Sequence, residues 1–229
     1  MDDESQAGEP SVHAGEPSVV RRPSSLLRLA LIADGFASDP ATADRTVAAA
    51  RAGALWVHLR DHEAGDDAFA DAARALADRL RAAAPSRVRL SVNSRLNEAE
   101  ALSAGLHTGR HGPSVDAARR ALGPDALVGA SAHDAGEARA AAGADYYFFS
   151  PVFPTASKPD HPGAGLDTLR RFCRTVPETP IFALGGVTPE RVAPCRAAGA
   201  HGVAVRSGIL YADDPPHATR QYLHALRRA

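Results

Sequence analysis

Residues 145–165 read DYYFFSPVFPTASKPDHPGAG, an aromatic run that passes directly into a long polar loop. The run over residues 146–149 predicts a buried strand. A loop of this length at the end of a strand usually carries function rather than connection alone. Its hydroxyl groups and its ammonium group suit an anionic ligand, and they belong to Ser150, Thr155, Ser157 and Lys158.

Strand and helix patterns alternate from Leu27 onward. Short apolar segments predict strands over residues 29–33, 55–60, 87–92, 106–108, 127–131, 146–149, 181–184 and 203–205. Helical patterns separate them, and the clearest covers residues 66–81, where apolar side chains recur at helical spacing. Ser114 and Asp134 are predicted N-caps, and Glu137 stands where a capping box would place its carboxylate.

Four joints between a predicted helix and the next strand carry a glycine. They are Ala52-Gly53-Ala54, Ala104-Gly105-Leu106, Ala142-Gly143-Ala144 and Ala198-Gly199-Ala200. We expect each glycine to adopt the left-handed conformation that ends a helix. The repeated unit predicts an α/β fold, the (β/α)8 TIM barrel, for which 229 residues suffice. The rival, an open doubly wound sheet, would require a Gly-x-Gly-x-x-Gly turn that residues 33–37 lack.

The first 25 residues differ in composition from the rest. The hexapeptide AGEPSV occurs at residues 7–12 and again at residues 14–19, and the segment has no aromatic residue. We therefore expect a disordered N-terminal tail over residues 1–25 and a barrel over residues 26–229.

Composition excludes several classes of function. A formal net charge of -1 gives no reason to expect a nucleic-acid partner. No apolar run approaches the ~18 residues of a membrane span, and the N-terminus does not resemble a secretory signal, so we expect a cytoplasmic protein. Cys173 and Cys195 lie in predicted helices without ligand-like spacing, which argues against a disulfide framework or a zinc site. Homo-oligomerisation stays open.

Active sites of such barrels lie at the C-terminal ends of the strands. Gly185, Gly186, Ser207 and Gly208 follow the last two strands and predict a phosphate site, the alternative being tight turns that need glycine. The other predicted site residues at strand ends are His58, Arg60, Asn93, Ser131, His133, Thr155, Ser157 and Lys158.

Two of these residues carry specific chemistry. Arg60 can bind a carboxylate or phosphate with both ends of its fork, or it can form a structural ion pair with Asp61 or Glu63. His133 follows a predicted strand directly, and an imidazole with a pKa near ~6.5 can move a proton at neutral pH. The alternative for His133 is a structural histidine.

The chain resembles the thiamine phosphate synthase and thiazole tautomerase family over most of its length. The resemblance rests on His58-Leu59-Arg60, Val92-Asn93, the runs 128–133 and 142–146, the segment from Phe149 to Lys158, the run 183–187, and the run from Ala198 to Gly208. It implies a (β/α)8 barrel that binds a thiazole phosphate.

The resemblance identifies the family more clearly than it identifies which of the family's two reactions, synthase or tautomerase, this chain would catalyse. A synthase would join a pyrimidine diphosphate to the thiazole phosphate, using Mg²⁺ held by two aspartates and a nearby lysine. Ser94, His62 and the carboxylate-free residues 110–113 stand at those positions. A tautomerase needs no metal and would use His133 as acid and base, with Arg60 and Lys158 holding the substrate's carboxylate. We therefore expect a cofactor-free thiazole tautomerase, with a Mg²⁺-dependent synthase or a non-catalytic thiazole-phosphate-binding barrel as the alternatives.

Overall fold

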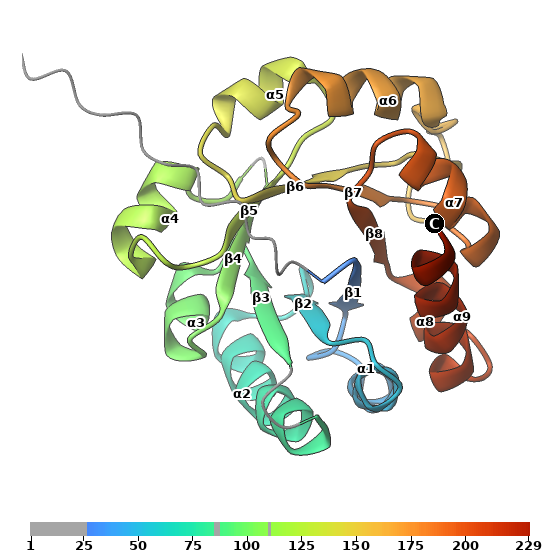
Figure 1. The fold of residues 1–229 in the computed structure, drawn as a ribbon. Coiled ribbons are helices and arrows are strands. Elements are labelled where there is room, and N and C mark those ends of the chain that lie inside the picture. The colour runs from blue at the N-terminus through green and yellow to red at the C-terminus, as the bar shows by residue number, and fades with distance from the viewer. Residues whose placement is uncertain (1–26, 85–87, 110) are drawn as a thin grey trace, which may run out of the picture.

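The computed structural model describes residues 27–84, 88–109 and 111–229. Within them, parallel strands β1 to β8 pair in chain order and close into a barrel, with helices around its outside (Figure 1). The predicted (β/α)8 fold is confirmed and the open sheet is excluded, whereas the predicted tail over residues 1–25 lies outside the described residues.

The elements follow the predicted alternation, with boundaries shifted by a few residues at most. The strands are β1 (Leu29–Asp34), β2 (Trp56–Arg60), β3 (Arg89–Asn93), β4 (Gly105–Thr108), β5 (Val128–Ser131), β6 (Tyr146–Phe149), β7 (Ile181–Leu184) and β8 (Gly202–Val205). The helices are α1 (Pro40–Arg51), α2 (Asp66–Ala83), α3 (Leu96–Ala101), α4 (Val115–Leu122), α5 (Ala135–Ala140), α6 (Gly165–Thr175), α7 (Pro189–Ala197), α8 (Ser207–Leu210) and α9 (Pro215–Arg228).

Strand β6 shows how alternation divides the core into two layers. Tyr146 and Phe148 point into the barrel, where they belong to the inner cluster around Trp56. Tyr147 and Phe149 point outward and pack against Phe172 of α6. Successive side chains of a strand point to opposite faces, so one aromatic run fills both the barrel interior and the layer beneath the helices.

The inner cluster closes the lower part of the barrel. Trp56 forms edge-to-face contacts with Tyr146 and Phe182, at centroid distances of 4.8 and 5.0 Å. Gly129 makes room for this packing, because a Cβ atom there would lie 2.0 Å from the Tyr146 ring. The lower interior is therefore a packed core, and a cavity lies above it at the C-terminal ends of the strands.

The expectation for the glycine joints holds at three positions and is wrong at the fourth. Gly53, Gly143 and Gly199 have positive φ angles of 113°, 85° and 105°. At the joint after α3, Ser103 takes the left-handed conformation instead, with φ of 50°. Gly105 is already the first residue of β4, where a Cβ atom would lie 2.7 Å from the Leu127 carbonyl oxygen.

Local signals at helix ends agree with the structure in most cases. The Ser114 side chain accepts a hydrogen bond from the Ala117 N–H, and the Asp134 side chain accepts from Gly136 and Glu137. Strand β8 ends at Val205, and Ser207 and Gly208 begin the short helix α8 instead of forming a tight turn. None of the helices in the described ranges is long and apolar enough to cross a membrane.

The left-handed serine gives a stability test. We expect Ser103→Gly to raise the free energy of unfolding by about 0.5–1 kcal/mol, because glycine adopts this conformation without strain. Ala101→Gly is the matched control: the residue is exposed and helical, and the change should lower stability by about 1 kcal/mol. Denaturant unfolding measures both, and a loss at Ser103 equal to that at Ala101 would contradict the interpretation.

Candidate active site

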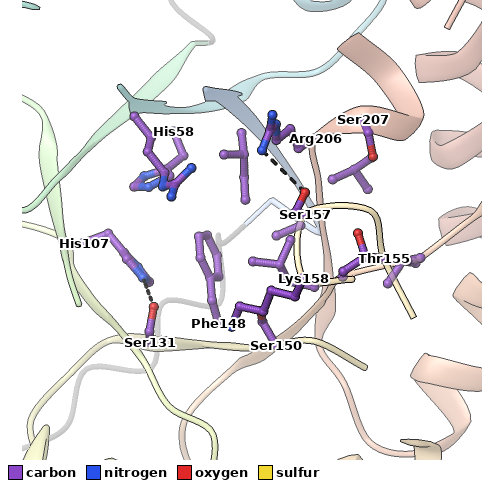
Figure 2. A pocket seen from close by; sticks show the side chains of 18 of the residues that line it. His58, His107, Ser131, Phe148, Ser150, Thr155, Ser157, Lys158, Arg206 and Ser207 are labelled. Atoms are coloured by element: carbon purple, nitrogen blue, oxygen red, sulfur yellow. Dashed lines mark hydrogen bonds between the residues drawn. The ribbon is translucent and has the colours of Figure 1, made fainter. Parts of the chain in front are cut away.

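A cavity of about 370 Å³ opens at the C-terminal ends of the strands (Figure 2). Every site residue that the sequence analysis named lines it: His58, Arg60, Asn93, Ser131, His133, Thr155, Ser157, Lys158, Gly185, Gly186, Ser207 and Gly208. The structure thus brings these side chains and turns to one place. Their chemical roles stay predictions.

The floor of the cavity carries two buried histidines. His58 Nδ1 lies 3.0 Å from Ser91 Oγ, and His107 Nε2 lies 3.0 Å from Ser131 Oγ. The two imidazole rings are 5.1 Å apart, and Phe148 stacks on His107 at a centroid distance of 4.4 Å. Figure 2 shows His107 reaching toward Ser131 from the neighbouring strand.

Burial keeps both floor histidines neutral. It lowers the pKa of His58 to about 3, and the positive charge of Arg60 acts in the same direction. The pKa of His107 is likewise well below its usual value, through burial and the neighbouring His58. At neutral pH the floor therefore presents uncharged rings, which suit a flat heterocycle better than a phosphate group.

One wall of the cavity carries two guanidinium groups that share one carboxylate. Asp34 Oδ2 lies 2.5 Å from Arg60 Nη1 and 2.9 Å from Arg206 Nη1. The proposed structural partners of Arg60, Asp61 and Glu63, are therefore wrong. Strand register explains the difference, since Asp34 is the direct neighbour of Arg60 across the β1–β2 pair.

Asp61 has a separate structural task. Its carboxylate accepts hydrogen bonds from the backbone N–H groups of Ala37 and Ser38, both at 3.0 Å. It thereby ties the loop after β1 to the loop after β2, behind the cavity wall. Arg60 is left to face Asp34 and the cavity.

The turn after β7 requires glycine for steric reasons. Gly185 and Gly186 have φ angles of 92° and 62°, and a Cβ atom on Gly186 would lie 2.4 Å from the Pro154 carbonyl oxygen. Arg191 donates a hydrogen bond to the Gly186 carbonyl at 2.6 Å and lies over the Phe153 ring. The turn is therefore fixed against the β6–α6 loop, and its backbone lines the cavity.

The β6–α6 loop forms the opposite wall. Thr155 and Lys158 form an isolated antiparallel bridge that holds the loop tip in a tight turn. Arg206 Nη1 donates to Ser157 Oγ at 3.5 Å, a contact that Figure 2 marks across the mouth. The loop and the end of β8 thus meet over the cavity.

His133 lies at the rim of the cavity rather than on its floor. Its side chain is 43% exposed, and its Nδ1 lies 2.7 Å from a carboxylate oxygen of Glu137. The same oxygen accepts the backbone N–H of His133, whereas a capping box would have used the N–H of Asp134. Glu137 therefore orients the imidazole, as a carboxylate does for a histidine that handles protons.

Sequence reasoning missed Asp34 as a member of the site, and it placed His107 and Arg206 at strand ends without assigning either of them a role. All three stand at or near strand ends, which was the available signal. Their roles depend on barrel closure, which makes β1 and β8 neighbours, and on which side chains point inward, which a four-residue strand hardly reveals.

The donor set does not fit a magnesium ion. Mg²⁺ binds through carboxylate oxygens, and the described part of the cavity lining contains neither Asp nor Glu. Among the described residues there is also no group of three His, Cys, Asp or Glu side chains that could hold a metal. Ser94 occupies one of the two positions where the family resemblance places an aspartate.

Known proteins resemble the chain across nearly the whole barrel. Residues 29–209 match the family described as thiamine monophosphate synthase. Over 144 residues, 61% of the chain, it is 49% identical to the thiamine biosynthesis bifunctional protein ThiM/ThiE of Symbiobacterium thermophilum, and it spans 30% of that longer protein. Over 191 residues it is 41% identical to the thiamine-phosphate synthase of Natronomonas pharaonis, covering 81% of this chain and 87% of the relative.

A solved structure shows the same fold. Thiamine phosphate pyrophosphorylase from Pyrococcus furiosus superposes with a TM-score of 0.75 at 26% sequence identity. The match covers 88% of this chain and 96% of that protein.

The buried histidines couple stability to pH. Unfolded imidazole has a pKa of ~6.5, whereas folding lowers the pKa of His58 to about 3. Between these values only the unfolded state binds the proton, so the folded state loses stability as pH falls from 6.5 toward 3. Between pH 7 and pH 5, we expect His58→Gln to lose about 2 kcal/mol less than the unaltered protein, measured by urea unfolding.

The exposed His62 supplies the matched control, since solvent surrounds it in the folded and unfolded chain alike. His62→Gln should follow the unaltered protein across the same pH interval. Equal pH dependence for His58→Gln and the unaltered protein would show that His58 is not held neutral by burial.

Proposed function

The chain belongs to the thiamine monophosphate synthase family, and we propose that it is a thiamine-phosphate synthase. In this reaction a hydroxymethylpyrimidine diphosphate is joined to a thiazole phosphate. The thiazole nitrogen forms a bond to the pyrimidine's methylene carbon, the bond from that carbon to oxygen breaks, and the diphosphate leaves with the electron pair. The near full-length likeness to a relative named thiamine-phosphate synthase supports this choice.

The charge of the cavity is the observation that carries the proposal. Its described lining includes three basic side chains, Arg60, Lys158 and Arg206, and the one carboxylate beside them, that of Asp34, is shared by the two arginines. A monophosphate and a diphosphate together need several cationic or N–H donors, whereas a single isomerised substrate needs fewer. The backbone of the Gly185-Gly186 turn and of Ser207-Gly208 at the start of α8 suits the thiazole's phosphate, which leaves the side-chain cations for the second anion.

The floor suits the two rings. His58 and His107 are neutral through burial, and Phe148 lies against His107. As the diphosphate departs, positive charge develops on the methylene carbon of the pyrimidine. Uncharged imidazoles do not oppose that charge, whereas protonated ones would. The low pKa of both histidines therefore favours the proposed bond exchange.

A thiazole tautomerase, the main expectation from the sequence, is the second candidate. The likeness to named synthases gives the isomerase no support, but His133 does: it lies at the cavity rim with Glu137 orienting its ring at 2.7 Å. A proton transfer that makes a thiazole aromatic needs such a group and no metal.

One assay separates these candidates. We expect the protein to form thiamine phosphate from the two precursors at an enzymatic rate, and to do so in His133→Asn with a loss below about tenfold. A tautomerase would instead isomerise the thiazole carboxylate phosphate and lose about 10²–10⁴-fold in His133→Asn. Chromatographic detection of both products measures this.

Failure has two recognisable forms. Isomerisation without thiamine phosphate formation would contradict the synthase. Binding of thiazole phosphate with no turnover of either kind would contradict both reactions and favour the non-catalytic barrel.

A further inference from the structure

The cavity wall has a surplus of positive charge, because two arginine side chains share a single carboxylate. Arg60, Asp34 and Arg206 come from three adjacent strand ends, and one carboxylate faces two guanidinium groups. Arginine stays protonated at any physiological pH, so the triad carries a net charge of about +1. The Asp34 side chain is 12% exposed, whereas Arg60 and Arg206 are 34% and 30% exposed and line the cavity. The surplus charge thus faces the ligand.

Arg206 is held in place from three sides. Asp34 binds its Nη1, the Tyr211 hydroxyl lies 2.6 Å from its Nη2, and its guanidinium lies 5.4 Å from the centre of the Tyr211 ring. The third residue in contact with it is Ser157, whose Oγ lies 3.5 Å from Arg206 Nη1, at the outer limit of a hydrogen bond. An anion oxygen entering between Arg206 and the β6–α6 loop would replace this weak contact at little cost. Lys158 is the next residue of that loop and also lines the cavity.

Because the described cavity lining lacks carboxylate ligands for Mg²⁺, the positive charge of the arginines is needed to balance a bound diphosphate. If the chain is a synthase, a diphosphate must bind and leave, and its negative charge must be balanced. The described cavity lining offers no carboxylate to hold Mg²⁺ for that purpose. Planar guanidinium groups bind phosphate oxygens in pairs and need no metal.

We propose that Arg206 binds the diphosphate of the pyrimidine substrate, and that together with Arg60 and Lys158 it allows the diphosphate to bind without a divalent cation. The proposal rests on the synthase reaction proposed above. Arg206 is assigned to the diphosphate rather than to the thiazole's phosphate, because its guanidinium contacts Asp34 and Ser157 and shares the Asp34 carboxylate with Arg60.

Inorganic diphosphate, titrated calorimetrically in the presence of EDTA, tests this directly and does not depend on turnover. We expect the unaltered protein to bind it, Arg206→Met to bind it about 10- to 100-fold more weakly, and Arg206→Lys to fall between, since lysine keeps the charge but loses the fork. Inorganic phosphate should lose less than about threefold in Arg206→Met. Arg74→Met removes the same charge from an exposed ion pair on α2 and should change neither affinity.

Several results would overturn the proposal. They are equal diphosphate affinity in Arg206→Met and the unaltered protein, equal weakening of phosphate and diphosphate, or binding of diphosphate only after Mg²⁺ is added. Thermal melting checks that each variant is folded, and Arg206→Lys decides the question if Arg206→Met does not fold. Arg206-dependent diphosphate binding in a protein that makes no thiamine phosphate would contradict the synthase reaction alone, so the two failures remain distinct.

Discussion

Barrel closure between the first and last strands is the constraint on which the site depends. Strand β1 pairs with β8 from Leu29↔Val203 to Leu31↔Val205, so residues about 170 positions apart in the chain share one rim. Without this pairing Asp34 and Arg206 would not meet, and Ser207 and Gly208 at the start of α8 would not line the same cavity as Arg60. The site is thus a product of the whole ring rather than of any local motif.

The barrel interior changes character along its axis. Its lower part is filled by Trp56, Tyr146 and Phe182, whose mutual contacts exclude water. Trp56 Nε1 donates to Ser91 Oγ, and the same oxygen lies 3.0 Å from His58. One buried hydroxyl therefore joins the apolar core to the neutral floor of the cavity. Above the floor come the charged side chains, where solvent and ligand reach them. Stability is concentrated at one end and chemistry at the other.

The sequence allowed the fold and most of the site to be predicted, because both depend on short-range patterns. Alternating apolar segments predicted the strands, and the strand-end rule predicted residues that do line one cavity. The features that could not be predicted from the sequence depend on tertiary packing. Asp34 as the partner of Arg60 follows from strand register, and Ser103 in place of Gly105 follows from where β4 begins. The inward direction of His107 was hard to predict, because β4 has only four residues, too few for a clear alternation.

Asp34 also resolves an electrostatic difficulty of the proposed site. Two guanidinium groups placed side by side at a half-buried rim would repel each other by several kcal/mol if nothing lay between them, at an effective dielectric constant of ~20. A carboxylate oxygen within 2.9 Å of both offsets that repulsion in the absence of ligand. It also fixes both forks before an anion arrives, so less side-chain entropy is lost on binding. A metal site obtains its positive charge from a bound ion. Here the positive charge comes from Arg60 and Arg206, which are part of the folded chain. The shared carboxylate is what makes such a fixed cationic wall stable enough to persist in the empty barrel.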